Sequence, residues 1–193
     1  MTSHCNPCTD ELEQLLLREP ALAAAWQALP RHTLAPRTTL LRAGENVQCA
    51  WRIESGLVRS YFLSPDGRER NHAFHAEQQW IGAGTPPAET ASPYAIETLE
   101  ETRVVELPYG LLREWQQRSL QVRSLLDAAF ERIFVRQTQR ESELLLLSAP
   151  ERYQAFVDAN PKLAARLPLH HVASYLGITN VALSRIRGRK TRG

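Results

Sequence analysis

The stretch from residue 109 to residue 147 constrains the fold more than any other part of the chain, because it holds no proline and only one glycine, near its start. These two residue types are the strongest breakers of a helical pattern. Apolar residues recur along the stretch at steps of three and four, the spacing of one helix face; they are Leu111, Leu112, Trp115, Leu125, Leu126, Ala129, Phe130, Ile133 and Phe134. The pattern predicts one long amphipathic helix, with Ser119 as the point where it could break.

A helix of this length raises the question of what covers its apolar side. It is far longer than the ~11-residue average, and a small sheet domain alone cannot bury the whole stripe. Self-association along the helix would bury the remainder. We therefore expect a homodimer formed through helix 109–147.

Between about Thr33 and Leu107 the pattern changes to short runs of alternating and β-branched residues. Residues 57–62 and 102–107 are examples, and such runs are typical of β-strands. Turn residues separate the runs at intervals of about 11 residues, as in antiparallel sandwiches and barrels. Asp66 and Gly67 form the clearest hairpin turn. The region is therefore expected to be an antiparallel, jelly-roll-like β-roll.

Short helices are expected on both sides of these regions. Two fit residues 9–29, where Pro20 interrupts the helical pattern, and others fit residues 151–187. The predicted fold class is α+β, with residues 1–108 as N-terminal helices and roll, 109–148 as the long helix, and 149–193 as a small all-helical domain. A chain of 193 residues with 43% hydrophobic content is long enough for one sizeable core and a second small one.

The charge distribution says more than the net charge of +2. From Arg185 to the last residue there are five basic side chains and no acid, which suits a polyanionic partner. No apolar run approaches the roughly 18 residues of a membrane span, and the first residues lack the features of a secretory signal. We therefore expect a cytoplasmic protein without a membrane partner.

The most informative local pattern lies in residues 169–187. Ala173 falls where two short helices would approach closely, Gly177 where the turn between them needs positive φ, and Thr179 where it can cap the second helix. Five apolar residues are spaced so that two steeply crossing helices share one core: Val172, Leu176, Ile178, Leu183 and Ile186. Together these positions predict a helix-turn-helix.

Packing of that core leaves a polar outer face near the start of the second helix. Asn180, Val181, Ser184 and Arg185 would face the major groove of double-stranded DNA, with Arg185 able to grip guanine. Four more side chains are better suited to phosphates: Thr179, Arg187, Arg189 and Lys190. The alternative is a helical hairpin whose basic face is merely solvated.

The order of these parts resembles the CRP/FNR superfamily of bacterial transcription regulators, over about residues 33–188. Residues 53–62, the hairpin turn at 66–67 and residues 80–82 look like a cyclic-nucleotide-binding β-roll, while residues 178–187 look like a recognition helix. The resemblance implies a sequence-specific, DNA-binding transcription regulator that dimerises through its long helix. It also implies a small-molecule effector and RNA polymerase as partners to consider.

Two departures from the family pattern matter. Where cyclic-nucleotide sensors carry Gly-Glu and Arg-Ser or Arg-Thr pairs, this chain carries residues 82–83 and 92–93, Gly-Ala and Ser-Pro. A buried phosphate without its arginine would be an unpaired charge, so we expect no cyclic AMP response unless Arg103 or Glu89 substitutes. The corresponding effector pocket would be lined by Trp80, Gly82, Ala83 and Ser92.

The second departure lies at the C-terminus. The chain stops at Gly193, soon after the second helix of the pair. The β-wing that usually follows this helix in the family would then be missing. We expect a truncated, wingless DNA-binding domain.

Three cysteines leave one further interpretation open. Cys5 and Cys8, with His4 beside them, and the distant Cys49 could complete a four-coordinate metal or cluster site, and hence a redox or metal sensor. Reduced thiols are the default for an odd number of cysteines in a chain of this size, so no metal and no cofactor is required.

A ligand-binding or protein-interaction module with a vestigial DNA domain is the alternative to a regulator. An enzyme is not expected, because the chain has no glycine-rich phosphate loop, nucleophile elbow or His-Glu-x-x-His motif. The histidines, among them His72, His75, His170 and His171, are expected to be structural.

Overall fold

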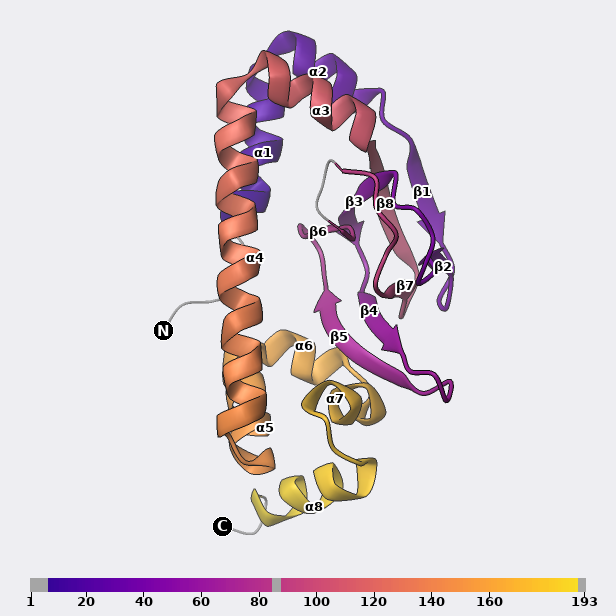
Figure 1. The fold of residues 1–193 in the computed structure, drawn as a ribbon, viewed down its shortest axis with the longest axis vertical. Helices are drawn as coiled ribbons and strands as arrows, with labels where there is room; N and C mark the ends of the chain where they lie inside the picture. Colours follow the sequence, from indigo (N-terminus) through magenta and orange to yellow (C-terminus); the bar gives the residue numbers. More distant parts are fainter. Residues whose placement is uncertain (1–6, 85–87, 191–193) are drawn as a thin grey trace.

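A computed structural model describes residues 7–84 and 88–190, and their side chains except those of residues 7–10 and 189–190 (Figure 1). The described residues begin with two short helices, α1 (Pro7–Arg18) and α2 (Pro20–Gln27). Pro20 opens α2, where a residue without an N–H is tolerated. The two helices expected within residues 9–29 are therefore present. Among the described residues, no helix combines the length and the apolar character needed to span a bilayer.

Within residues 7–84 and 88–190, eight strands form two antiparallel sheets of four. The first sheet has the order β1 (Arg31–Leu34), β8 (Thr102–Pro108), β3 (Cys49–Ser55) and β6 (Trp80–Ile81). The second has the order β2 (Thr39–Leu41), β7 (Ala95–Thr98), β4 (Val58–Leu63) and β5 (Glu69–His75). The predicted antiparallel roll is confirmed, including the hairpin turn at Asp66 and Gly67 between β4 and β5.

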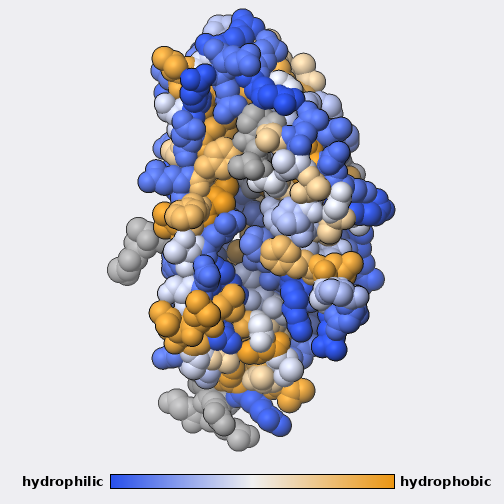
Figure 2. All heavy atoms as spheres, in the orientation of Figure 1, coloured by the Kyte–Doolittle hydropathy of each residue, from blue (hydrophilic) through white to orange (hydrophobic). Residues whose placement is uncertain are grey.

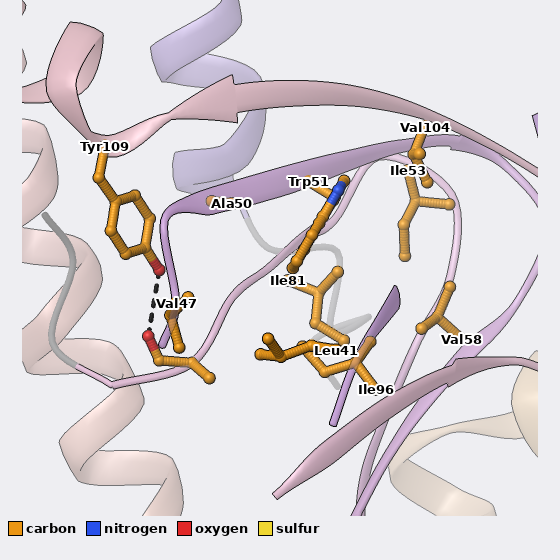
Figure 3. Close-up of a cluster of buried hydrophobic side chains, with 11 residues drawn as sticks. Leu41, Val47, Ala50, Trp51, Ile53, Val58, Ile81, Ile96, Val104 and Tyr109 are labelled. Carbon is orange, nitrogen blue, oxygen red and sulfur yellow. Dashed lines mark hydrogen bonds between the residues drawn. The ribbon is translucent and has the colours of Figure 1, made fainter. Parts of the chain in front are cut away.

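The core of the roll lies between the sheets (Figure 3). Trp51 and Ile53 from β3 meet Ile96 from β7 and Val58 from β4 there. Tyr109 seals one end, where its fully buried ring places its hydroxyl to donate to the Ala83 carbonyl at 3.1 Å. Alternation along the strands directs these side chains inward.

The long helical stretch is divided at Ser119. Helix α3 (Tyr109–Arg118) and helix α4 (Leu120–Leu146) meet at this residue, whose φ of −131° and ψ of 115° are extended. Its side-chain oxygen caps α4 by accepting from the Val122 N–H at 3.4 Å. The break therefore falls at the point that the sequence had indicated.

A second core joins the helices to the outside of the first sheet. Leu16, Trp26, Trp115 and Val122 from α1 to α4 pack together, with residues of β8 beneath them. This cluster anchors the first turns of α4. The rest of α4 runs past the roll (Figure 1).

Four short helices follow α4 in the described part of the chain: α5 (Ala149–Ala159), α6 (Pro161–Arg166), α7 (Leu169–Leu176) and α8 (Asn180–Lys190). A capping box between Ser148 and Glu151 starts α5. The third core lies between these helices and the roll, since Leu57 and Phe74 pack with Phe156 and Leu176. The small helical domain thus shares its core with the second sheet.

Gly56 lies in the turn between β3 and β4, where its backbone comes close to Glu101 and Thr102. Its φ is +107°, and an added Cβ would lie 2.5 Å from the Thr102 hydroxyl and 2.7 Å from the Glu101 carbonyl oxygen. Gly44 has a φ of +85° but nothing within 4 Å. We expect Gly56→Ala to lower the free energy of unfolding by about 3 kcal/mol and Gly44→Ala by about 1 kcal/mol, because only the first adds a clash to the backbone strain. Urea unfolding measures both, and equal losses would contradict the proposed clash.

The buried histidines predict an acid-sensitive fold. Burial lowers the pKa of His75 to about 3, helped by the charge of Arg136. Burial also lowers the pKa of His171 to about 4, helped by His170 and Arg59. Between those values and the ordinary 6.5 the unfolded chain binds protons that the folded chain does not, so this stability is present above pH 6.5 and is lost as the pH falls.

We therefore expect the Tm to be lower at pH 5 than at pH 7. The variant His75→Gln, which removes one of these two groups, should show a shallower dependence. Thermal unfolding followed by circular dichroism measures both slopes. A Tm that is unchanged or higher at pH 5 would show that the assignment is wrong.

Candidate nucleic-acid interface

Helices α7 and α8 and the turn between them form the predicted helix-turn-helix. Gly177 ends α7 with a φ of 71° and a ψ of 29°, in the left-handed region. The nearest atom to an added Cβ there would be a Leu144 methyl at 3.9 Å, so the backbone angle and not crowding favours glycine. Thr179 accepts from the Ala182 N–H at 3.2 Å. Both the turn glycine and the cap are confirmed.

The shared core of the two helices is as expected. Val172, Ala173, Leu176 and Leu183 are buried, and the last two are completely so. Ile178 and Ile186 are half-buried at its edge. The steep crossing of α7 and α8 is visible at the lower end of the molecule (Figure 1).

One polar face of α8 remains open to solvent. Its exposed side chains are Asn180, Val181, Ser184, Arg185 and Arg187, and Thr179 is exposed just before them. Val181 is 60% exposed although it is apolar. Neither Arg185 nor Arg187 makes an ion pair with any described residue, so both can meet an anion. The side chains of Arg189 and Lys190 lie outside the described residues.

Two arginines hold the helix-turn-helix against the rest of the chain. Arg140 of α4 donates to the Tyr175 carbonyl, and its guanidinium lies 4.0 Å from the centre of the Tyr175 ring. Arg152 of α5 donates to the Leu176 carbonyl at 3.1 Å and to the Leu147 carbonyl at 2.6 Å. These contacts satisfy carbonyls at the ends of α7 and α4 that have no helical partner.

The roll holds α7 from the other side. Asn71 of β5 donates from its backbone N–H to the Ser174 hydroxyl at 3.0 Å and from its side chain to the His171 carbonyl at 3.0 Å. Its side-chain oxygen accepts from Arg59 at 3.2 Å. Arg59 is itself buried and paired with Glu69 at 2.7 Å and with Glu97 at 2.9 Å. A buried polar network therefore fixes the orientation of α7.

An ion-pair cluster adds a second attachment at α6. Arg166 donates to both carboxylate oxygens of Glu77, each at 2.9 Å, and to Glu100 at 2.5 Å. The paired arginine holds the pKa of Glu77 below its ordinary value. Sequence reasoning missed these positioning residues, because no local pattern links side chains so far apart along the chain.

Of the four residues proposed for an effector pocket, Gly82, Ala83 and Ser92 are hydrogen-bonded to Tyr94 or Tyr109. Tyr94 donates to the Gly82 carbonyl at 2.8 Å, and Ser92, which is buried, donates to the Tyr94 carbonyl. Ala83 is 1% exposed, and its carbonyl accepts from Tyr109. Trp80 is half-buried against Trp26, with ring centroids 5.8 Å apart. The Gly82 and Ala83 carbonyls and the Ser92 hydroxyl therefore already have hydrogen-bond partners within the chain.

The proposed substitutes for the missing arginine are engaged elsewhere. Arg103 pairs with Glu54 at 3.4 Å, and Glu89 pairs with Arg113 at 2.8 Å. All four side chains of these pairs are substantially exposed. Neither ion pair joins the hydrogen bonds that link residues 82, 83 and 92 to the tyrosines.

The cysteines are only partly within the described residues. Cys5 and the side chain of Cys8 lie outside them. Cys49 is half-buried on β3, and burial, with the nearby Glu106 charge, raises its pKa to about 12. Within the part of the chain that the structure describes, no group of three His, Cys, Asp or Glu side chains could hold a metal ion.

The outer side of α4 carries apolar side chains with no partner among the described residues. Phe134 is 68% exposed and Val135 58%, while Phe130 is half-buried. A shallow groove beside them is lined by Phe134, Val135, Thr138, Gln139 and Ser142. Figure 2 shows hydrophobic side chains along this edge of the molecule.

Comparisons with known proteins agree with this arrangement. Residues 31–119 match the family model of the cyclic nucleotide-binding domain. The fumarate and nitrate reduction regulatory protein of Vibrio cholerae is 25% identical over 96% of this chain and 80% of its own length. The transcriptional activator protein Anr of Pseudomonas protegens is 25% identical over 76% of this chain and 64% of its own length.

Two solved structures share the fold. FixK2 from Bradyrhizobium japonicum superposes with a TM-score of 0.75 at 21% identity, covering 84% of each chain. The catabolite activator protein of Thermus thermophilus gives a TM-score of 0.56 at 21% identity, covering 92% of this chain and 86% of that one. With its roll, its long helix and its helix-turn-helix, the chain belongs to the CRP/FNR family of transcription regulators.

Proposed function

We propose that this regulator is a homodimer that binds double-stranded DNA in a sequence-specific way through α8. The observation that carries the proposal is the open polar face of α8, whose side chains remain exposed while Leu183 is fully buried in the shared core and Ile186 half-buried at its edge. In this scheme residues 1–108 are the sensor, 109–148 the dimerisation helix and 149–193 the DNA reader. The regulator would act in the cytoplasm, with the DNA, and without enzymatic activity.

Each exposed side chain of α8 has a role in the proposed complex. Arg185 reads guanine through a pair of hydrogen bonds, and Asn180 and Ser184 meet neighbouring base edges. Val181 is placed for an apolar contact with a thymine methyl group. The side chains assigned to phosphates are Thr179, Arg187, Arg189 and Lys190.

The exposed stripe of α4 supports the proposed dimer. A second copy packed along Phe134 and Val135 would remove both side chains from water. It would also set the distance between the two copies of α8, which must lie about 34 Å apart to enter successive major grooves. RNA polymerase is a further partner that such a regulator would contact.

The proposed effector is not cyclic AMP in the usual mode. The hydrogen bonds of Gly82 and Ser92 are made within the chain, and Arg103 pairs with Glu54. A phosphate placed among these groups would lack an arginine partner, which is costly for a buried charge. Calorimetry that detects micromolar binding of cyclic AMP would contradict this part of the proposal.

Replacement of Arg185 by alanine tests the DNA contact. We expect Arg185→Ala to weaken binding to a selected operator by about 10–100-fold while weaker, nonspecific binding persists, because one bidentate base contact is lost. Gel shifts on DNA from a selection experiment give the measurement. Arg123→Ala, on the exposed surface of α4, is the matched control and should bind like the wild type. A wild type that binds no DNA at low salt would instead favour a vestigial DNA domain.

A charge placed in the exposed stripe tests the dimer. We expect Phe134→Asp to give a folded monomer with at least about 10-fold lower operator affinity, since two linked half-sites are no longer bound together. Sedimentation equilibrium gives the mass, and gel shifts give the affinity. Gln117→Asp, exposed on α3, is the control that should remain dimeric. A monomeric Phe134→Asp that keeps full DNA affinity would refute the role of α4.

A further inference from the structure

A groove lies between α1 and the first turns of α4, where the two helices run side by side (Figure 1). Its apolar part consists of Leu15 from α1 and of Leu120 and Leu125 from α4. Leu15 and Leu125 are half-buried, whereas Leu120 is 76% exposed. The remaining lining is polar: Glu11, Gln14, Arg18, Gln121 and Ser124. An apolar centre within a polar rim is typical of a surface that another protein covers.

This upper groove lies on the same face of α4 as the groove beside Phe134 and Val135. Four residues of α4 line the upper groove, and each stands two seven-residue repeats before a residue of the lower one. The upper set is Leu120, Gln121, Ser124 and Leu125, and the lower set is Phe134, Val135, Thr138 and Gln139. Such a repeat keeps one seam in contact with a partner helix that twists around it left-handedly, over about 21 Å here.

The repeat between the two grooves offers little apolar surface. Its matching positions hold Asp127, Ala128, Glu131 and Arg132, of which three are charged. Burial of a charge without a partner is costly, so a second helix gains little by packing tightly there. At the upper end of α4, the apolar area on this seam is therefore that of the groove shared with α1.

We propose that α4 of a second copy of this chain docks in the upper groove, so that α1 forms part of the dimer contact. Two-fold symmetry brings Leu120 of each copy to the groove of the other. Association then removes Leu120 and the open edge of Leu15 from water. This inference rests on the proposed homodimer and adds to it a surface from the N-terminal helix.

The same helix supplies a matched control. Leu17 is also exposed on α1, at 51%, but it does not line the groove. Gln14 is exposed and lines it. Because these two positions lie on different sides of one helix, the proposed dimer covers Gln14 and leaves Leu17 in water.

Photo-crosslinking from α1 tests which chain occupies the groove. Benzoylphenylalanine replaces Gln14 or, in the control, Leu17 in the full chain, and isotopically heavy and light protein are mixed before irradiation. From position 14 we expect links between α1 of one copy and α4 of the other, identified as mixed heavy–light peptides. From position 17 we expect such links to be at least about 5-fold fewer, because that side chain lies outside contact distance.

Sedimentation equilibrium measures what the groove contributes to association. We expect Leu120→Asp to raise the Kd of the dimer by at least about 10-fold, because a leucine that association would bury is lost. Leu17→Asp, which changes an equally apolar exposed residue, should dimerise like the wild type. Both side chains are exposed in the single chain, and circular dichroism checks that both variants are folded.

The outcomes separate this inference from the proposed function. A dimeric wild type whose position 14 links only within its own chain would overturn the role of α1 and leave the homodimer standing. Equal Kd values for Leu120→Asp and Leu17→Asp would do the same. A wild type that sediments as a monomer at every concentration would instead contradict the proposed homodimer itself, and this inference with it.

Discussion

The hydrogen bonds of Asn71 are the point on which the arrangement of roll and reader depends. Asn71 is buried on β5, where Arg59 holds its side-chain oxygen while its two donors reach α7. Phe74, on the same strand, packs into the helical core beside Tyr175. Because buried polar groups are costly when unpaired, this network permits few other orientations of α7. The position of α8 follows from it, since α7 and α8 share one core.

Helix α4 connects the helix-turn-helix to helices α1 to α3 at the other end of the molecule. Its first turns are buried under α1 to α3, and Arg140 near its end contacts the helix-turn-helix. Its outward side carries exposed apolar residues, Phe134 and Val135 among them. In the proposed dimer, packing along this side of α4 would set the spacing between the two copies of α8.

The predicted acid sensitivity of the fold comes from two neutral histidines, one in the roll and one at its contact with α7. His171 is neutral where its backbone carbonyl accepts from Asn71, and His75 is neutral inside the roll. Protonation of His171 would add a positive charge near Arg59, and protonation of His75 would add one near Arg136. Both arginines already lower the pKa of the histidine beside them. We therefore expect the contact between roll and reader to weaken as the pH falls.

The sequence by itself determined the features that depend on near neighbours. The strand alternation, the break at Ser119, the left-handed turn at Gly177 and the cap at Thr179 each follow from a few adjacent residues, and the structure confirms them. The sequence also predicted which face of α8 is exposed. Once the apolar residues are assigned to the core, the polar residues on the other side of the helix must face solvent.

The tertiary structure alone decided how the parts meet. Arg59, Arg152 and Arg166 read as ordinary surface charges in the sequence, yet each positions the helical domain through partners remote in the chain. The Nε and Nη2 atoms of Arg132, buried without a hydrogen-bond partner among the described residues, also stand out only when their surroundings are known. The physical reason is that periodicity reports which face of a helix is apolar, whereas the partner of a charge depends on distances that no local spacing encodes.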